Sequence, residues 1–173
     1  MEISLRLYNK KDRKDYKQLF PLMRSFLEDY CGKKEIDDIR VNNAIFAYLS
    51  LNKETNEAYF FEDDNHEVIG FCVITKELRT NSIKIHHFYI SPPFRRDKAH
   101  HWGTAALNLI KSLLNPDYIT LDVINGNETA REFWKSLGFI EKVESFSRIS
   151  GFPYINKFTL NINVKLKGKK FIK

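Results

Sequence analysis

The chain has 173 residues and a formal net charge of +6, with 43% hydrophobic and 29% charged residues. This composition is typical of a soluble globular protein, and no apolar run is long enough to span a membrane. The two cysteines, Cys31 and Cys72, lie far apart, which argues against a disulfide framework and predicts a cytoplasmic location. The positive charge favours anionic ligands, RNA among them.

The first 32 residues predict one strand followed by one helix. Residues 3–8 alternate between apolar and polar side chains, as in a half-buried strand. Asn9 or Asp12 can cap the helix that follows, and Gly32 is suited to end it. Pro21 lies inside the helical pattern, so the helix is either kinked there or begins near it. The apolar stripe of this helix consists of Leu19, Leu22, Met23, Phe26, Leu27 and Tyr30.

A second helix and a hairpin are predicted next. The helix covers about residues 36–51, with apolar side chains at helical spacing. Residues 58–61 and 68–75 read as two strands, and the acidic stretch 62–67 between them predicts a hairpin turn. Charged hairpin tips are usually solvated, which is what we expect of this one.

Residues 82–114 predict a strand, a basic loop and a helix, in that order. The strand, over residues 82–90, is rich in β-branched and aromatic side chains and is closed by a Ser-Pro-Pro sequence. The helix carries Gly103 in its first turn and ends at Asn115 and Pro116. Because unpaired N–H groups at a helix N-terminus bind phosphate, the basic loop predicts an anion site. The loop carries Arg95, Arg96, Lys98, His100 and His101.

The last third of the chain predicts a strand over residues 118–124, a turn at 125–127, a helix, and two further strands over 139–149 and 154–166. Strands alternate with helices in the middle of the chain and pair as hairpins at both ends. This order predicts an α/β fold with a mixed sheet covered by helices on both faces.

We expect a single domain over residues 1–166 and a basic C-terminal tail over residues 167–173. A lysine-rich end of this kind is most simply a frayed, solvated segment. A basic surface that binds RNA is the alternative, and it would show binding that weakens steeply with salt.

Two ordered motifs resemble a known family. The stretch from Phe88 to Arg95, followed by Gly103-Thr104-Ala105-Ala106-Leu107, is similar to the acetyl-CoA signature of GCN5-related N-acetyltransferases (GNAT). Downstream, Asn127 to Ala130 and Phe133 to Phe139 match the second signature of that family. The resemblance implies a mostly antiparallel central sheet with a splayed pair of parallel strands, and coenzyme bound between them. It also implies that the first two helices line the acceptor pocket, with Asp29, Tyr30 and Tyr48 as candidate contacts.

The coenzyme loop departs from the family pattern. From Arg95 to Gly103 the chain advances eight positions (103 − 95), whereas the family's arginine precedes its last glycine by five. Counted back from Gly103, Lys98 takes the arginine position, while Ala99 and His101 stand where the family has glycines that admit the pyrophosphate. The residues that the resemblance assigns to acetyl-CoA are Phe88, Tyr89, Ile90, Arg95, Arg96, Lys98, His101, Trp102, Gly103, Thr104, Asn127 and Trp134; no metal is expected.

Acetyl transfer to an amine needs an oxyanion site, a base for the amine and an acid for the thiolate. The resemblance places the oxyanion near the backbone N–H groups of Phe88 to Ile90. His86 and His87 point to opposite faces of the strand, so only one of them can face the cleft. Lys84 and His86 fall where arylalkylamine acetyltransferases, a branch of the family, carry two histidines that relay the amine's proton, and this resemblance favours His86 as the base. Either histidine could instead simply pack across strands. Trp134 stands where the family has its acidic tyrosine and cannot release a proton, so water or Tyr89 is the candidate acid.

The leading hypothesis is an acetyl-CoA-dependent N-acetyltransferase acting on a primary amine of a small molecule, a peptide or an aminoacyl acceptor. The alternative is a catalytically silent protein that binds acyl-CoA or RNA and works by interaction. No membrane partner is expected, and a homodimer is possible.

Overall fold

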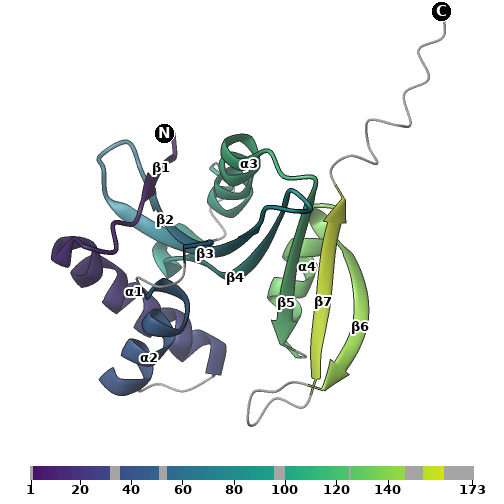
Figure 1. Ribbon diagram of the computed structural model, residues 1–173, viewed down its shortest axis with the longest axis horizontal. Coiled ribbons are helices and arrows are strands. Elements are labelled where there is room, and N and C mark those ends of the chain that lie inside the picture. The colour runs from purple at the N-terminus through teal and green to yellow at the C-terminus, as the bar shows by residue number, and fades with distance from the viewer. Residues whose placement is uncertain are drawn as a thin grey trace, which may run out of the picture. The chain divides into compact units, whose positions relative to one another are not determined.

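The computed structural model describes residues 2–31, 36–50, 54–95, 100–124, 126–146 and 154–161 (Figure 1). A seven-stranded sheet has the order β1-β2-β3-β4-β5-β7-β6. The pairs β1–β2, β2–β3, β5–β7 and β6–β7 are antiparallel, whereas β4 and β5 are parallel from Ser82–Tyr118 to Ile85–Leu121. The predicted mixed α/β fold is confirmed. The elements are β1 (Ser4–Leu7), α1 (Arg13–Cys31), α2 (Asp38–Leu49), β2 (Asn56–Glu62), β3 (Val68–Glu77), β4 (Ser82–Ile90), the short η1 (Pro92–Phe94), α3 (Trp102–Leu114), β5 (Tyr118–Ile124), α4 (Glu128–Ser136), β6 (Ile140–Phe146) and β7 (Tyr154–Asn161).

The chain divides into two compact units. The first comprises residues 1–75 and 87–114, and the second comprises residues 76–86 and 115–173. Strand β4 contributes to both, and the boundary falls between His86 and His87. The expected single domain over residues 1–166 stays a prediction, and the tail at 167–173 lies outside the described residues.

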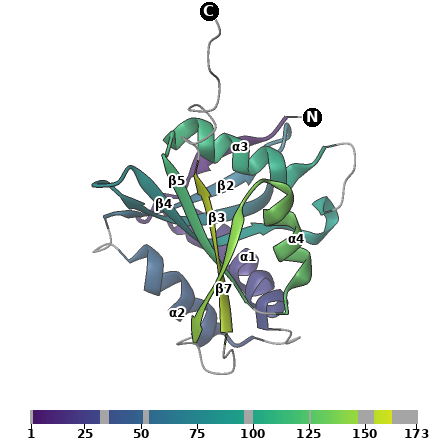
Figure 2. The same cartoon turned by 90° about the vertical axis from the view of Figure 1, so that its right-hand side faces the viewer.

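Helices cover both faces of the strands in the first unit, with α1 and α2 on one side and α3 on the other (Figures 1 and 2). The core under α1 and α2 includes Leu19, Met23 and Leu27, three members of the stripe predicted for the first helix. Helix α1 runs through Pro21, where the carbonyl of Lys17 loses its helical partner because proline has no N–H group.

Two aspartates determine where the first two helices begin. The carboxylate of Asp12 accepts the N–H of Lys14 at 2.8 Å, so Asp12 caps α1. The carboxylate of Asp37 accepts the N–H of Arg40 at 2.7 Å and caps α2. Because of this cap, α2 starts two residues later than the sequence predicted.

The charged turn between β2 and β3 was expected to be solvated, and this expectation is wrong for its first two residues. Glu62 and Asp63 are 8% and 4% exposed. One carboxylate oxygen of Asp63 accepts the N–H groups of Asn65 and Glu67 at 2.9 and 2.8 Å, which closes the turn from inside. The acidic residues therefore build the turn.

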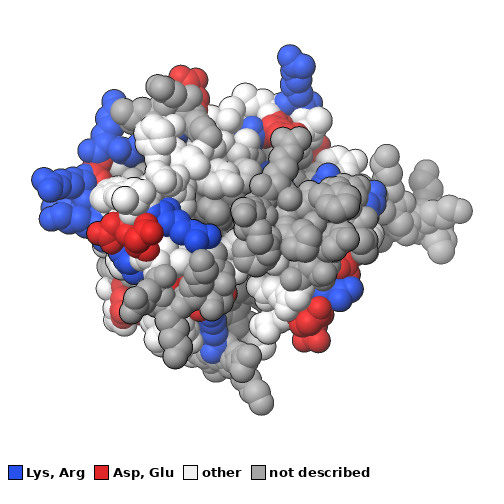
Figure 3. Space-filling view, turned by 90° about the horizontal axis from the view of Figure 1, so that it is seen from below, with Lys and Arg blue, Asp and Glu red and all other residues white. Residues whose placement is uncertain are grey.

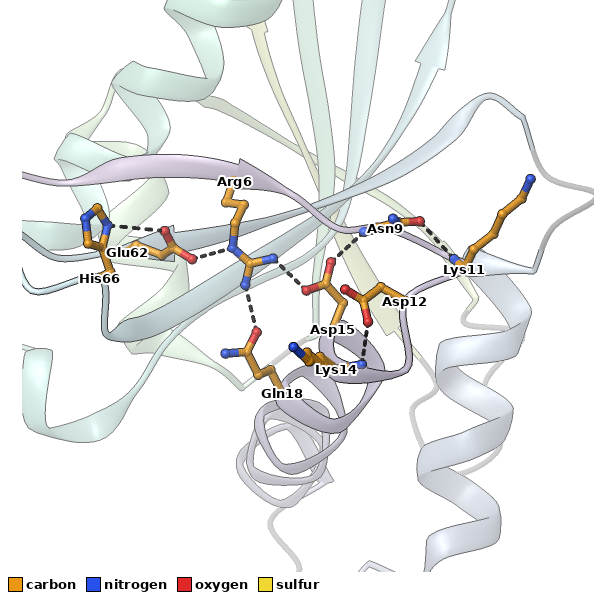
Figure 4. Close-up of polar contacts among 9 residues, drawn as sticks. All are labelled: Arg6, Asn9, Lys11, Asp12, Lys14, Asp15, Gln18, Glu62 and His66. Atoms are coloured by element: carbon orange, nitrogen blue, oxygen red, sulfur yellow. Dashed lines mark hydrogen bonds and ion pairs between the residues drawn. The ribbon is translucent and has the colours of Figure 1, made fainter.

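Glu62 is held by Arg6 of β1, which forms the centre of a polar cluster (Figure 4). The guanidinium donates to Glu62 at 2.5 Å, to Asp15 of α1 at 2.6 Å and to Gln18 at 2.7 Å. It also lies 4.5 Å from the centroid of the Phe60 ring. The cluster joins β1, β2 and α1 through one cation whose two carboxylate partners are almost buried.

Cys72 lies in the core of the first unit, on β3, and is fully buried. Burial raises the pKa of its thiol, because a thiolate there would lose its hydration. A buried thiol with a raised pKa is poorly reactive. Of the side chain of Cys31 the structure gives no description.

In the second unit, β5, β7 and β6 pair in antiparallel fashion. Helix α4 comes between β5 and β6 in the sequence. Ile119 and Phe158, on paired strands, are fully buried. The strand predicted over 118–124 is observed with the same bounds. The strands predicted over 139–149 and 154–166 are described over shorter ranges, and residues 147–153 and 162–166 lie outside the description.

Candidate active site

The carboxyl end of β4 is fixed by a close approach of β3. A Cβ atom at Gly70 would lie 2.2 Å from the carbonyl oxygen of Tyr89 and 3.1 Å from the Cα atom of Ile90. The next residue, Ser91, donates its N–H to the carbonyl of Ile69 at 2.8 Å. Only glycine permits this spacing, so the backbone of the predicted oxyanion segment is held tightly against β3.

Successive side chains at this end of β4 face opposite sides of the sheet. His87 lies between Phe26 of α1 and Tyr48 of α2, at ring-centroid distances of 4.7 and 4.8 Å. Tyr89 also contacts Phe26, at 6.1 Å. Phe88 instead contacts Phe61, at 5.4 Å. His87 and Tyr89 therefore face the two helices that the family resemblance assigns to the acceptor pocket.

Tyr89 is 4% exposed, and burial raises the pKa of its phenol. The guanidinium of Arg95 lies 4.8 Å from the ring centroid and acts in the opposite direction on that pKa. Because the shift is upward, the phenol is protonated at neutral pH, as a general acid must be before it acts, and it is a weaker acid than an ordinary tyrosine.

Arg95, which the sequence assigned to phosphate, makes three contacts with protein groups. Its Nε–H donates to the carbonyl of Ile90 at 2.6 Å. Its Nη2 atom lies 2.6 Å from a carboxylate oxygen of Asp29, in the last turn of α1. Its guanidinium carbon lies over the ring of Tyr89. The other candidates in this loop, Arg96 and Lys98, lie outside the described residues.

The N-terminus of α3 has the features of an anion site. Hydrogen bonds of its first turn begin with Thr104 and Ala105, whose N–H groups donate to the carbonyl of His101 at 2.9 and 3.1 Å. The preceding N–H groups, those of Trp102 and Gly103, are the ones that a bound anion would use. Trp102 is 3% exposed, and among the described residues its buried indole N–H has no acceptor. These donors fit a phosphate-bearing ligand.

His101 has a backbone φ of 48°, in the left-handed region that favours glycine. The family resemblance places a glycine at this position, and the left-handed conformation here is one that glycine adopts without a steric penalty. We expect His101→Gly to stabilise the protein by up to about 1 kcal/mol, because a Cβ atom is disfavoured there. Thermal unfolding would measure the gain. His101→Ala is the control: it removes the imidazole but keeps the Cβ atom, and a gain of equal size would show that the backbone is not the cause.

Asn127 and Trp134, the two candidates of the second unit, are both engaged in its structure. The side-chain oxygen of Asn127 accepts the N–H of Ala130 at 3.1 Å and caps α4. Trp134 is 6% exposed and contacts the rings of Phe133 and Phe139 at 4.9 and 5.1 Å. The cap leaves the amide NH₂ as the group with which Asn127 could bind a ligand.

Basic side chains gather over the N-terminal part of α1, away from the coenzyme loop in the sequence (Figure 3). The exposed basic residues there are Lys11, Arg13, Lys14 and Lys17. Part of the positive charge that suggested an anionic ligand therefore comes from α1 and the residues just before it.

Among the described residues there is no group of three or more His, Cys, Asp or Glu side chains that could hold a metal ion. In the same part of the chain, no helix has the length and apolar character needed to cross a membrane.

A family model described as the acetyltransferase (GNAT) family matches residues 18–139. The match spans more than half of the chain and includes the end of β4, the start of α3 and α4. This protein therefore belongs to the GNAT acetyltransferases, as its two sequence motifs indicated. No curated protein sequence matches it.

Solved acetyltransferase structures share the fold. A spermidine N-acetyltransferase from Vibrio cholerae in complex with CoA and spermine superposes with a TM-score of 0.68 at 17% identity, over 95% of this chain and 98% of that one. An acetyltransferase from Thermus thermophilus gives 0.70 at 14% identity, over 94% and 98%. A GNAT-family acetyltransferase from Staphylococcus aureus gives 0.63 at 18% identity, over 92% and 99%.

Proposed function

We propose that this protein transfers the acetyl group of acetyl-CoA to a primary amine of a small molecule, a peptide or an aminoacyl acceptor. The observation that carries the proposal is the strand–loop–helix segment, in which the end of β4 is fixed by Gly70 and α3 offers amide donors at its start. The solved relative that holds CoA and spermine supports an amine acceptor in general, without naming the acceptor of this chain.

In this proposal each signature keeps the role toward the coenzyme that the family resemblance gives it. The N–H groups of Trp102 and Gly103 and the side chain of His101 serve the pyrophosphate. The amide of Asn127 serves the pantetheine arm, as in the family. Trp134 contributes by packing α4 rather than by donating a proton, since an indole does not ionise near neutral pH.

Acetyl-CoA supplies the activated acetyl thioester, and the chain supplies three functions. Backbone N–H groups of Phe88 to Ile90 stabilise the negative charge that develops on the carbonyl oxygen. His86 accepts the proton of the attacking amine, because an imidazole changes protonation near neutral pH. Tyr89, which burial keeps protonated, donates a proton to the departing thiolate. We propose His86 and Tyr89 as the base and the acid on these grounds.

The test is acetyl transfer from acetyl-CoA to a panel of primary amines, combined with thermal unfolding in the presence of CoA. We expect CoA to raise the melting temperature, since a ligand that binds only the folded state stabilises it. We expect His86→Ala to lower kcat roughly 100-fold and to flatten its pH dependence near the imidazole pKa. His87→Ala is the comparison variant, because His87 lies on the face of β4 opposite to His86 and contacts Phe26 and Tyr48. If His86 is the base, His87→Ala lowers the melting temperature and keeps the pH profile. A pH profile that is flattened by His87→Ala would assign the proton transfer to the histidine that faces α1 and α2 instead.

Each outcome separates the hypotheses. A melting temperature that does not respond to saturating CoA would exclude the enzyme and the silent coenzyme-binding protein together. Binding of CoA without turnover on any amine would favour the catalytically silent alternative. Full activity of His86→Ala with an unchanged pH profile would show that another group accepts the proton. The cytoplasmic location and the homodimer remain predictions.

A further inference from the structure

The last turn of α1 carries two acidic side chains at the end of the helix where negative charge is least favourable. Glu28 and Asp29 lie close to the C-terminus of the helix, and no basic residue occurs in its last turn. The helix macrodipole disfavours carboxylates at this end. Asp29 is compensated by the guanidinium of Arg95, at 2.6 Å. In the part of the chain that the structure describes, no ion pair is formed by Glu28, although its charge acts on the hydroxyl of Tyr89.

Arg95 is committed to the protein by contacts of three different kinds. Its Nε–H satisfies the carbonyl of Ile90, its Nη2 atom pairs with Asp29, and its π face covers Tyr89. An arginine that moved to a phosphate would leave the carbonyl and the carboxylate without a donor and would uncover the phenol ring. The contacts therefore compete directly with the phosphate role that the loop sequence suggested.

These contacts also join two parts of the proposed active site. Ile90 and Tyr89 form the end of the strand that presents the oxyanion N–H groups and the candidate acid. Asp29 belongs to the helix that the resemblance assigns to the acceptor. Because the side chains of Arg95 and Asp29 are 39% and 49% exposed, the pair is accessible to solvent, and its role depends on geometry more than on Coulomb energy.

We propose that Arg95 is a positioning residue, which holds Tyr89 and the carbonyl of Ile90 in place and ties them to α1 through Asp29, and that it is not a phosphate ligand. This inference rests on the proposed function and adds to it a contact between the acceptor helix and the coenzyme strand. It assigns the phosphates to the N-terminus of α3.

The test measures dissociation constants by isothermal titration calorimetry for CoA and for pantetheine, which has no phosphate. The variants are Arg95→Met, Asp29→Asn and the double variant. If Arg95 positions the strand, each single variant weakens CoA binding by about tenfold, and the double variant binds CoA no more weakly than either single variant. Arg95→Met then also weakens pantetheine binding by the same factor. Glu28→Gln is the matched control, since it removes the neighbouring charge, and it should leave both constants unchanged.

The competing hypothesis, that Arg95 binds phosphate, predicts the opposite effect of Asp29→Asn on CoA affinity. If Arg95 binds phosphate, Asp29→Asn frees the guanidinium and strengthens CoA binding, whereas Arg95→Met weakens CoA and spares pantetheine. Either result would overturn the inference and leave the proposed function standing. A wild-type protein that binds neither ligand would instead contradict the proposed function. Melting temperatures of all variants, measured without ligand, establish that each is folded, and Arg95→Lys replaces Arg95→Met if that variant does not fold.

Discussion

Replacing Gly70 with alanine is expected to destabilise the first unit by about 3 kcal/mol, near the upper end for overpacked sites. The new methyl group would lie 2.2 Å from the carbonyl oxygen of Tyr89, and the obstacle is backbone that cannot rotate away. Strand β4 would have to move from β3, breaking the hydrogen bond from Ser91 to Ile69. Chemical denaturation measures the loss, and calorimetry with CoA would report weaker binding if the oxyanion segment shifts.

Gly126→Ala is the control for this prediction, because it separates crowding from backbone conformation. Gly126 has a φ of 92°, but a Cβ atom there would have no heavy-atom neighbour within 4 Å. Its replacement should cost only about 1 kcal/mol, the ordinary penalty for a side chain in the left-handed region. Equal losses at the two glycines would show that β3 and β4 separate easily and that the close approach is not important for stability.

The second large effect is expected at Arg6. Arg6→Met removes the cation from Asp15 and Glu62, whose side chains are 7% and 11% exposed. Each carboxylate would then lack its main partner in a poorly hydrated place, which typically costs about 3 kcal/mol. This value is the lower end of the usual loss in stability for a broken buried ion pair, and we expect it because the side chain of Arg6 is itself 34% exposed. Urea denaturation at neutral pH would measure the change.

A variant that also neutralises the two acids tests the physical reason. In the background Asp15→Asn with Glu62→Gln, the same Arg6→Met change should cost much less, because no uncompensated charge remains. If the cost is the same in both backgrounds, the contribution of Arg6 comes from its packing against Phe60 instead.

The fold was predictable because its strongest signals are local. Strands β4 and β5 appear with the bounds that their β-branched residues predicted, and the Asn115–Pro116 ending of α3 was correct. The turn before α4 is likewise local, since Gly126 adopts the positive φ and Asn127 caps the helix that follows.

Contacts between distant segments were not predictable in the same way. The pairing of Asp29 with Arg95 joins residues 66 positions apart, and no pattern in either segment names the other. The same holds for Arg6 and Glu62, 56 positions apart, and for this reason the hairpin tip was wrongly expected to be solvated. One weak signal was present: Glu28 and Asp29 end a helix whose last turn contains no basic residue, and a cation from elsewhere stabilises such an arrangement.

The only indication of the left-handed backbone at His101 came from the comparison with the family pattern. The sequence showed a histidine in a glycine position, and it could not show whether the loop would change its path or accept the strain. At His101 itself the structure shows the left-handed conformation, with φ at 48°.

The burial of Cys72 turns this residue into a reporter of opening events in the first unit. A thiolate that reaches water attacks an electrophilic thiol reagent, and here the thiol is fully buried on β3 with a raised pKa. In a Cys31→Ser background Cys72 is the chain's single thiol, so its labelling rate measures how often this strand becomes exposed. Since the other unit carries no cysteine, slow labelling beside rapid hydrogen exchange in β5 to β7 would reveal that the two units open independently.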